Sequence, residues 1–119
     1  MREILFRGKR LVDGKWIAGY FVVTGRYNAI KPKGEVYYGV DPSTVGQYTG
    51  LTDKDGKKIF EGDIIGDGER KYAVSFEKGC WVILGKIEFW DFLQTNAKSY
   101  EVIGNIHDNP ELLEVLTDE

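Results

Sequence analysis

Cys80 and His107, the single cysteine and the single histidine, are the residues whose types could support nucleophilic catalysis. A catalytic thiol requires a lowered pKa, which a helix N-terminus or a neighbouring cation usually provides. Cys80 instead opens an apolar segment at residues 80–84, where we expect the thiol to act as a small buried hydrophobic group. His107 precedes an expected helix start, a common structural position for a polar ring. The pair therefore indicates no thiol-dependent enzyme.

The acidic segment at residues 53–56, Asp-Lys-Asp-Gly, resembles the beginning of a calcium-binding loop. An EF-hand loop would place an oxygen ligand at its fifth position and a bidentate glutamate at its twelfth. Those two positions hold Lys57 and Ile64, so the spacing does not fit. The segment is instead typical of a hairpin turn between two strands.

Metal, phosphate and paired-carboxylate sites are not indicated either. With one histidine and one cysteine, a metal site would consist of carboxylates such as Glu61, Asp63 and Asp67. Acids beside turns are usually solvated instead. The sequence lacks the phosphate-binding patterns GxGxxG and GxxxxGK followed by Ser or Thr. Nothing singles out a catalytic pair among the 19 acids, so we predict no catalytic residue, no metal and no cofactor.

The charged residues are divided unevenly along the chain. Residues 1–40 hold eight Lys or Arg against three acids, whereas residues 41–119 hold eight against sixteen. The basic part could meet nucleic acid, or the acidic half of a neighbouring subunit, or only solvent. Its first hairpin combines cations with Trp16 and Tyr20, so a nucleic-acid or partner surface is predicted there, formed by Arg7, Lys9, Arg10 and Lys15.

Length and composition predict a small cytoplasmic protein. A chain of 119 residues suits one domain, or two small lobes with a shared core. One cysteine allows no internal disulfide, which suits a reducing compartment. No run approaches the ~18 apolar residues of a membrane span, so no membrane partner is expected.

Segments rich in aromatic and β-branched residues are separated by glycines, and this pattern predicts many short strands. Residues 2–12 and 15–23 form the clearest hairpin, with Asp13-Gly14 as a type I′ turn. Gly8 and Gly19 interrupt these strands, as a bulge or a close backbone approach would. Short edge strands are expected near residues 26–30 and 35–40.

The pattern of short strands resumes at Val45. Residues 80–84 are nearly all apolar, so we expect the most buried strand there. A short helix is predicted at residues 88–93, and Asn109-Pro110 suits a helix N-cap and first turn. The other expected strands are residues 47–49, 57–60, 63–65, 70–76 and 99–106.

Three stretches of the sequence resemble the YopX-like proteins. The central one comprises residues 47–51, 53–57 and 59–65, and the closing one residues 102–113. The opening residues 2–7, with Trp16 and Gly19-Tyr20, fit as well. His107-Asp108 departs from the family, which more often has an aromatic residue and an acid there.

The resemblance implies an origin in bacteriophages or prophages, an SH3-like barrel in the C-terminal part and an unknown function. No catalytic or ligand residue of the family carries over.

We therefore predict an all-β protein with minor α content. An N-terminal β-hairpin or meander lobe (residues 1–44) accompanies an SH3-like barrel with a short C-terminal helix (residues 45–119), as one cooperative unit. The expected function is non-enzymatic binding by a phage accessory protein, through self-association and a host or phage protein partner. Nucleic-acid binding by the basic hairpin is the alternative, and an enzyme of unrecognised type is another.

Overall fold

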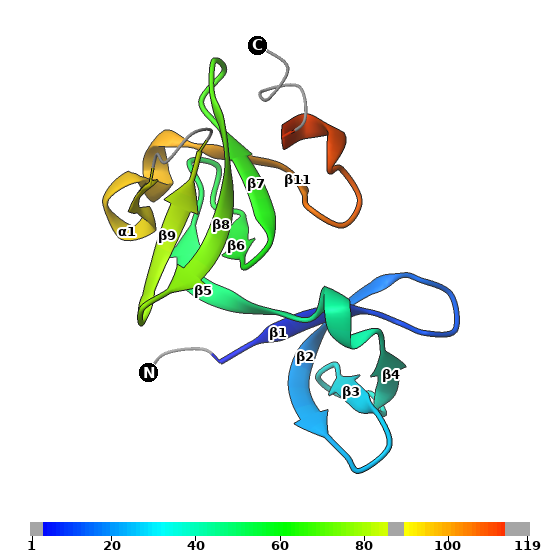
Figure 1. Ribbon diagram of the computed structural model, residues 1–119. Coiled ribbons are helices and arrows are strands. Elements are labelled where there is room, and N and C mark those ends of the chain that lie inside the picture. Colours follow the sequence, from blue (N-terminus) through cyan, green and yellow to red (C-terminus); the bar gives the residue numbers. More distant parts are fainter. Residues whose placement is uncertain (1–3, 86–89, 114–119) are drawn as a thin grey trace. The chain divides into compact units, whose positions relative to one another are not determined.

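The protein was analysed as a computed structural model that describes residues 4–85 and 90–113 (Figure 1). Strands dominate these residues, in two antiparallel sheets with one short α-helix, which confirms the all-β prediction. The chain divides into two compact units, residues 1–50 and 51–119. No helix in the described part of the chain is long and apolar enough to cross a membrane.

The first unit is built from strands that follow one another as antiparallel neighbours, in the order β4-β3-β2-β1-β5. Its β1–β2 hairpin pairs Phe6 with Gly19 and Lys9 with Trp16. Gly8 faces inward, since an added Cβ would touch Ile30 and Val40. The strands are β1 (Phe6–Lys9), β2 (Trp16–Val23), β3 (Asn28–Lys31), β4 (Tyr38–Val40) and β5 (Gly46–Thr52), with a 3-10 turn at Pro42–Thr44 before β5.

Gly19 marks a close approach of two backbone segments, as its position in the sequence predicts. A Cβ added there would lie 2.1 Å from the Lys31 carbonyl oxygen, which only glycine allows. The Asp13-Gly14 turn differs from the prediction. Gly14 has a positive φ of 71°, but Asp13 is not among the residues with positive φ, so the turn is not type I′. The loop is longer, because the Arg10 N–H donates to the Lys15 carbonyl across four residues.

The second unit contains a five-stranded antiparallel sheet in the order β10-β9-β8-β7-β11. This sheet is open, with β10 and β11 at its edges, so the predicted SH3-like barrel is not confirmed. The short β6 pairs with β5. The elements are β6 (Lys58–Phe60), β7 (Asp63–Gly66), β8 (Lys71–Glu77), β9 (Cys80–Leu84), β10 (Trp90–Phe92), α1 (Leu93–Asn96), a 3-10 turn (Ala97–Ser99) and β11 (Glu101–Asn105).

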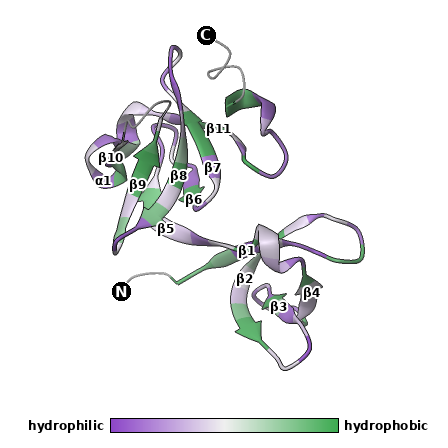
Figure 2. Ribbon diagram, in the orientation of Figure 1, coloured by the Kyte–Doolittle hydropathy of each residue, from purple (hydrophilic) through white to green (hydrophobic). Residues whose placement is uncertain are grey.

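The core of the second unit lies between this sheet and the helical turns that follow β10. Tyr72 and Tyr100 meet edge to face there, with ring centroids 5.5 Å apart. Hydrophobic residues concentrate in β7 and β9 (Figure 2). The buried cluster comprises Ile59, Ile65, Tyr72, Val74, Ile83, Leu93, Ala97 and Tyr100.

Two helix predictions need correction. Residues 86–89 lie outside the described residues, but Trp90–Phe92 is a strand, and the helix runs instead over Leu93–Asn96. The amphipathic spacing therefore placed the helix a few residues too early. Residues 111–113 are helical, as predicted. The Asn109 side chain, however, accepts the Asn105 N–H instead of capping the helix.

Candidate binding surfaces

Arg7 and Lys9, two of the four predicted surface residues, lie together on the indole of Trp16. The Arg7 guanidinium carbon is 4.8 Å and the Lys9 ammonium 5.5 Å from a Trp16 ring centroid. Strand alternation explains this, because Arg7 and Lys9 are two residues apart and Lys9 pairs directly with Trp16. Tyr20, which shares this face by the same alternation, is 65% exposed. The face thus offers two fixed cations beside an exposed aromatic ring.

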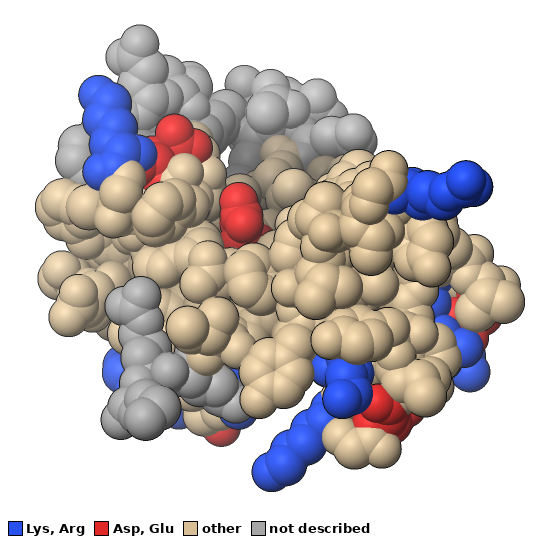
Figure 3. All heavy atoms as spheres, turned by 90° about the horizontal axis from the view of Figure 1, so that it is seen from below, with Lys and Arg blue, Asp and Glu red and all other residues tan. Residues whose placement is uncertain are grey.

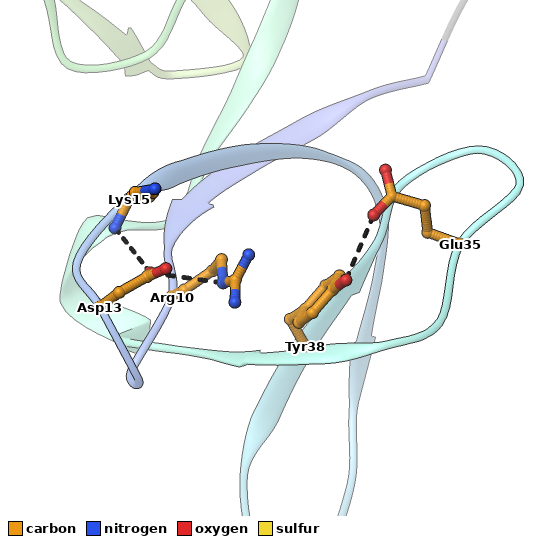
Figure 4. A network of polar contacts seen from close by, with 5 residues as sticks. All are labelled: Arg10, Asp13, Lys15, Glu35 and Tyr38. Carbon is orange, nitrogen blue, oxygen red and sulfur yellow. Dashed lines mark hydrogen bonds and ion pairs between the residues drawn. The ribbon is translucent and has the colours of Figure 1, made fainter.

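Arg10 belongs to a different network, because its odd offset from Lys9 turns it to the other side of the strand. Its guanidinium lies 4.3 Å from the Tyr38 ring centroid, and its Nε lies 3.3 Å from an Asp13 carboxylate oxygen. The Tyr38 hydroxyl donates to Glu35 at 3.2 Å. Figure 4 shows Arg10 between Asp13 and Tyr38. Arg10 therefore links the hairpin loop at Asp13 to Tyr38 of β4.

Lys15, the fourth predicted residue, is exposed, and its backbone N–H donates to Asp13. The structure thus brings Arg7 and Lys9 together but separates Arg10 from them. On the face drawn in Figure 3, Lys and Arg side chains form separate groups, several of them beside Asp or Glu side chains.

Asp53, in the segment that resembles a calcium loop, is a buried turn residue with 1% of its surface exposed. Its carboxylate accepts the backbone N–H groups of Asp55, Lys57 and Val102, each at 2.9 Å. Burial raises the pKa of Asp53, but these three donors lower it more, so the net shift is downward. The carboxylate therefore fixes the β5–β6 turn to β11.

Asp63 and Asp67, two candidates for an oxygen-ligand site, also accept backbone N–H groups. Asp63 is 1% exposed and accepts from Phe60 at 2.7 Å. Asp67 accepts from Glu69 and Arg70, and these hydrogen bonds lower its pKa. Among the described residues, no group of three or more His, Cys, Asp or Glu is arranged to hold a metal.

The closing motif around His107 is a compact turn. The Asn105 side-chain oxygen accepts the N–H groups of His107 and Asp108. A Cβ added to Gly104 would lie 2.6 Å from the Asn109 side-chain oxygen. These contacts explain the motif structurally, since the glycine leaves room for the asparagine that ties the turn.

The outer face of β9 carries an apolar hollow, which the sequence analysis missed. Cys80, Val82 and Leu84 alternate on this face, and Phe92 of β10 pairs with Val82. The space above them measures about 510 Å³, and Glu77 and Lys78 also line it. Leu84 and Phe92 are 37% and 46% exposed.

The hollow corrects the prediction for Cys80, which is exposed and not buried. In β9, Ile83 faces the core with Trp81 packed beside it, whereas Cys80 and Leu84 face outward. A continuous apolar run predicts burial on both faces, and here it marks one core face and one exposed apolar face. That run was the signal that could have revealed the hollow.

A second apolar feature, also missed, is the tip of the β1–β2 hairpin. Leu11 and Val12 are 64% and 77% exposed there, between Arg10 and Asp13. The hairpin end extends as a loop beyond its strands (Figure 1).

Comparison with known proteins shows which family and which solved structure this chain is similar to. A family model described as YopX protein matches residues 19–114. None of the curated proteins matches the chain. Among solved structures, it is similar to the crystal structure of protein EF1440 from Enterococcus faecalis, with a TM-score of 0.58 and 21% identity. This likeness covers 95% of this chain and 99% of that chain, and at such identity it shows the fold alone.

Proposed function

Because the chain belongs to the YopX protein family, whose function is unknown, we propose from its surfaces that it is a non-enzymatic binding protein. It acts through protein contacts, including contacts with further copies of itself. The observation that carries this proposal is the apolar hollow over β9, where Leu84 and Phe92 are 37% and 46% exposed. Exposed apolar patches on sheet faces are typical of protein-binding sites.

The acidic residues support binding over catalysis. Asp53, Asp63 and Asp67 accept backbone N–H groups of their own turns, and Asp53 also accepts that of Val102 in β11. A catalytic carboxylate would instead face a pocket with other polar groups. The hollow over β9 is lined by the apolar side chains of Val82, Leu84 and Phe92 and by Cys80, Glu77 and Lys78.

The proposed setting is the cytoplasm of a bacterial host, where the protein serves a phage or prophage as an accessory factor. The sequence motifs shared with YopX-like proteins support this origin, and Cys80, a single free thiol, suits a reducing compartment. The proposal that the second unit is a variant SH3-like barrel rests on its succession of short antiparallel strands.

Self-association is the part of this function that can be tested without knowing a partner. Sedimentation velocity over a range of concentrations should show the wild-type mass rising, and Leu84→Asp should lower that mass. Ile103→Asp is the matched control, because Ile103 is 39% exposed in the same unit but is not among the residues that line the hollow. A strict monomer at low and high salt would contradict self-association.

Nucleic-acid binding is the second candidate, favoured by the face that carries Arg7, Lys9 and Tyr20. Fluorescence anisotropy with labelled single- and double-stranded DNA and with RNA at low salt tests it. Removal of two phosphate contacts by Arg7→Gln with Lys9→Gln should weaken binding and lower the salt dependence by about two ion equivalents. The matched control is the double variant Arg26→Gln with Lys33→Gln, which removes the same charge from other, exposed positions of the first unit. Absence of binding at low salt would exclude this candidate.

A further inference from the structure

We propose that the β1–β2 hairpin tip of one copy, formed by Leu11 and Val12, docks into the apolar hollow over β9 of a second copy. The inference rests on the proposed protein-binding function and names its partner and both contact surfaces. It joins the two exposed apolar features described above, one protruding and one concave.

The hairpin tip is held in a fixed shape before any contact. The Arg10 N–H donates to the Lys15 carbonyl at 2.9 Å, and the Gly14 N–H donates to the Arg10 carbonyl at 2.8 Å. Asp13 adds the ion pair with Arg10 and accepts the Lys15 N–H at 3.1 Å. A preorganised loop loses little conformational freedom on docking, which favours binding by its two apolar side chains.

The hollow has the size and lining to receive such a tip. Its volume of about 510 Å³ lies in the range of sites that enclose small ligands or a few side chains. Val82 forms its floor, being 4% exposed, and the more exposed Leu84 and Phe92 stand beside it. Two aliphatic side chains would cover apolar surface that now faces solvent.

The net charges of the two units favour contact between a tip and a hollow over contact between two tips or two hollows. Residues 1–50 hold eight Lys or Arg against four Asp or Glu, a net charge of +4, and residues 51–119 hold eight against fifteen, a net charge of −7. A tip-to-hollow contact brings units of opposite sign together, whereas hollow-to-hollow or tip-to-tip contact joins like charges. Locally, Lys15 lies beside the tip, and Glu77, of the opposite charge, lines the hollow.

Because the two contact surfaces differ, variants of each should complement one another. Val12→Asp damages the tip and leaves the hollow, and Leu84→Asp damages the hollow and leaves the tip. Each variant alone should associate at least tenfold more weakly than wild type in sedimentation velocity. An equimolar mixture keeps one intact tip and one intact hollow, so it should form a dimer.

The matched control for the tip is Val36→Asp, since Val36 is 66% exposed in another turn of the same unit. It should associate like wild type. If Leu84→Asp weakens association but Val12→Asp does not, the protein-binding function stands and the tip is not its partner. If the mixture stays monomeric, the tip-to-hollow contact is wrong. A folded far-UV circular dichroism spectrum is required of every variant.

Disulfide trapping maps the contact directly, because Cys80 is an exposed native thiol in the hollow. A chain with Val12→Cys and Cys80→Ser is mixed with wild type and oxidised with copper phenanthroline, which accepts the two electrons released by the thiols. We expect a disulfide-linked heterodimer that diminishes from 50 to 500 mM NaCl. Crosslinking of wild type alone through Cys80, without the heterodimer, would show hollow-to-hollow contact and overturn the proposal.

Discussion

The two units differ in what surrounds several of their aromatic rings. In the second unit, Tyr72 and Tyr100 pack inward among buried aliphatic side chains. In the first, Trp16, Tyr37 and Tyr38 each carry a cation over the ring. The described residues of this unit contain four such contacts, at distances of 4.3 to 5.7 Å from the ring centroids.

The two units also differ in the contacts that stabilise them. The second unit is held by apolar burial and by Asp53, whose carboxylate joins a turn to β11. The first unit also buries apolar side chains, with Ile30 and Val40 at 0% and 1% exposure, and it adds the close approach at Gly19 and cation–ring contacts near its surface. Its exposed apolar and charged side chains remain directed outward, where a partner can reach them.

The largest expected effect tests the core of the second unit. Ile83→Ala should lower the free energy of unfolding by about 2–5 kcal/mol, because it leaves a cavity at a residue with 0% exposure. Val23→Ala in the first unit, where the side chain is 70% exposed, should change it by less than about 0.5 kcal/mol. Urea unfolding followed by circular dichroism measures both.

The same variant tests whether the units unfold together. One cooperative unit predicts that Ile83→Ala lowers the global protection of core amides in both units, measured by hydrogen exchange. If amides of β2 keep their wild-type protection while those of β8 lose it, the two units unfold separately.

The next effect concerns the anchored turn. Asp53→Ala should cost about 3 kcal/mol, because it leaves the N–H groups of Asp55, Lys57 and Val102 without their acceptor. Asp55→Ala, at an exposed position of the same turn, should cost less than about 0.5 kcal/mol. Equal costs for the two variants would show that the buried carboxylate does not stabilise the turn.

Asp53 also predicts a dependence on pH. Its folded pKa lies below its unfolded value, so its contribution is fully present above the unfolded pKa of about 4. The contribution is lost as the pH falls through the folded pKa. The difference in unfolding free energy between wild type and Asp53→Asn should therefore shrink with acidification below about pH 4. A constant difference down to pH 2 would contradict this.

A smaller effect tests the first unit. Gly19→Ala should lower the unfolding free energy by about 1–3 kcal/mol, because the new Cβ would meet the Lys31 carbonyl oxygen and force β2 and β3 apart. Gly25→Ala is the matched control, since no atom lies within 4 Å of its added Cβ and its φ is not positive. Comparison of the two by thermal unfolding separates the clash from a general effect of removing glycine.

The strands and several turns could be predicted from the sequence, because these elements depend on local residue types. The Lys78-Gly79 turn lies between the expected strands at residues 70–76 and 80–84, and it has positive φ at both residues, of 51° and 81°. The positive φ at both residues that a type I′ turn requires occurs there and not at Asp13-Gly14, where Arg10 extends the loop. The close approach at Gly19 was anticipated, although only the fold identifies Lys31 as the neighbour.

The features that could not be predicted from the sequence depend on which strands become neighbours in the fold. The exposed state of Cys80 depends on whether another element covers the outer side of β9, and the apolar run alone does not decide between a covered and an exposed apolar face. The partners of Arg10 likewise come from Asp13 and from Tyr38, a residue 28 positions later. The burial of an acceptor such as Asp53 cannot be predicted from neighbouring residues alone, because one of its donors is the distant Val102.

The smallest expected effect decides how the first unit uses its aromatic rings. A double-mutant cycle of Arg10→Gln with Tyr38→Leu should give a coupling of about 0.5–1 kcal/mol, since the guanidinium lies 4.3 Å from the ring centroid and is partly shielded from water. Lys15→Gln paired with Tyr38→Leu should show none, because Lys15 is an exposed cation of the same hairpin. High salt should weaken the Arg10–Asp13 ion pair but reduce the ring coupling less. If the Arg10–Tyr38 coupling were also zero, this contact would add nothing to the stability that strand pairing and the burial of Ile30 and Val40 give the first unit.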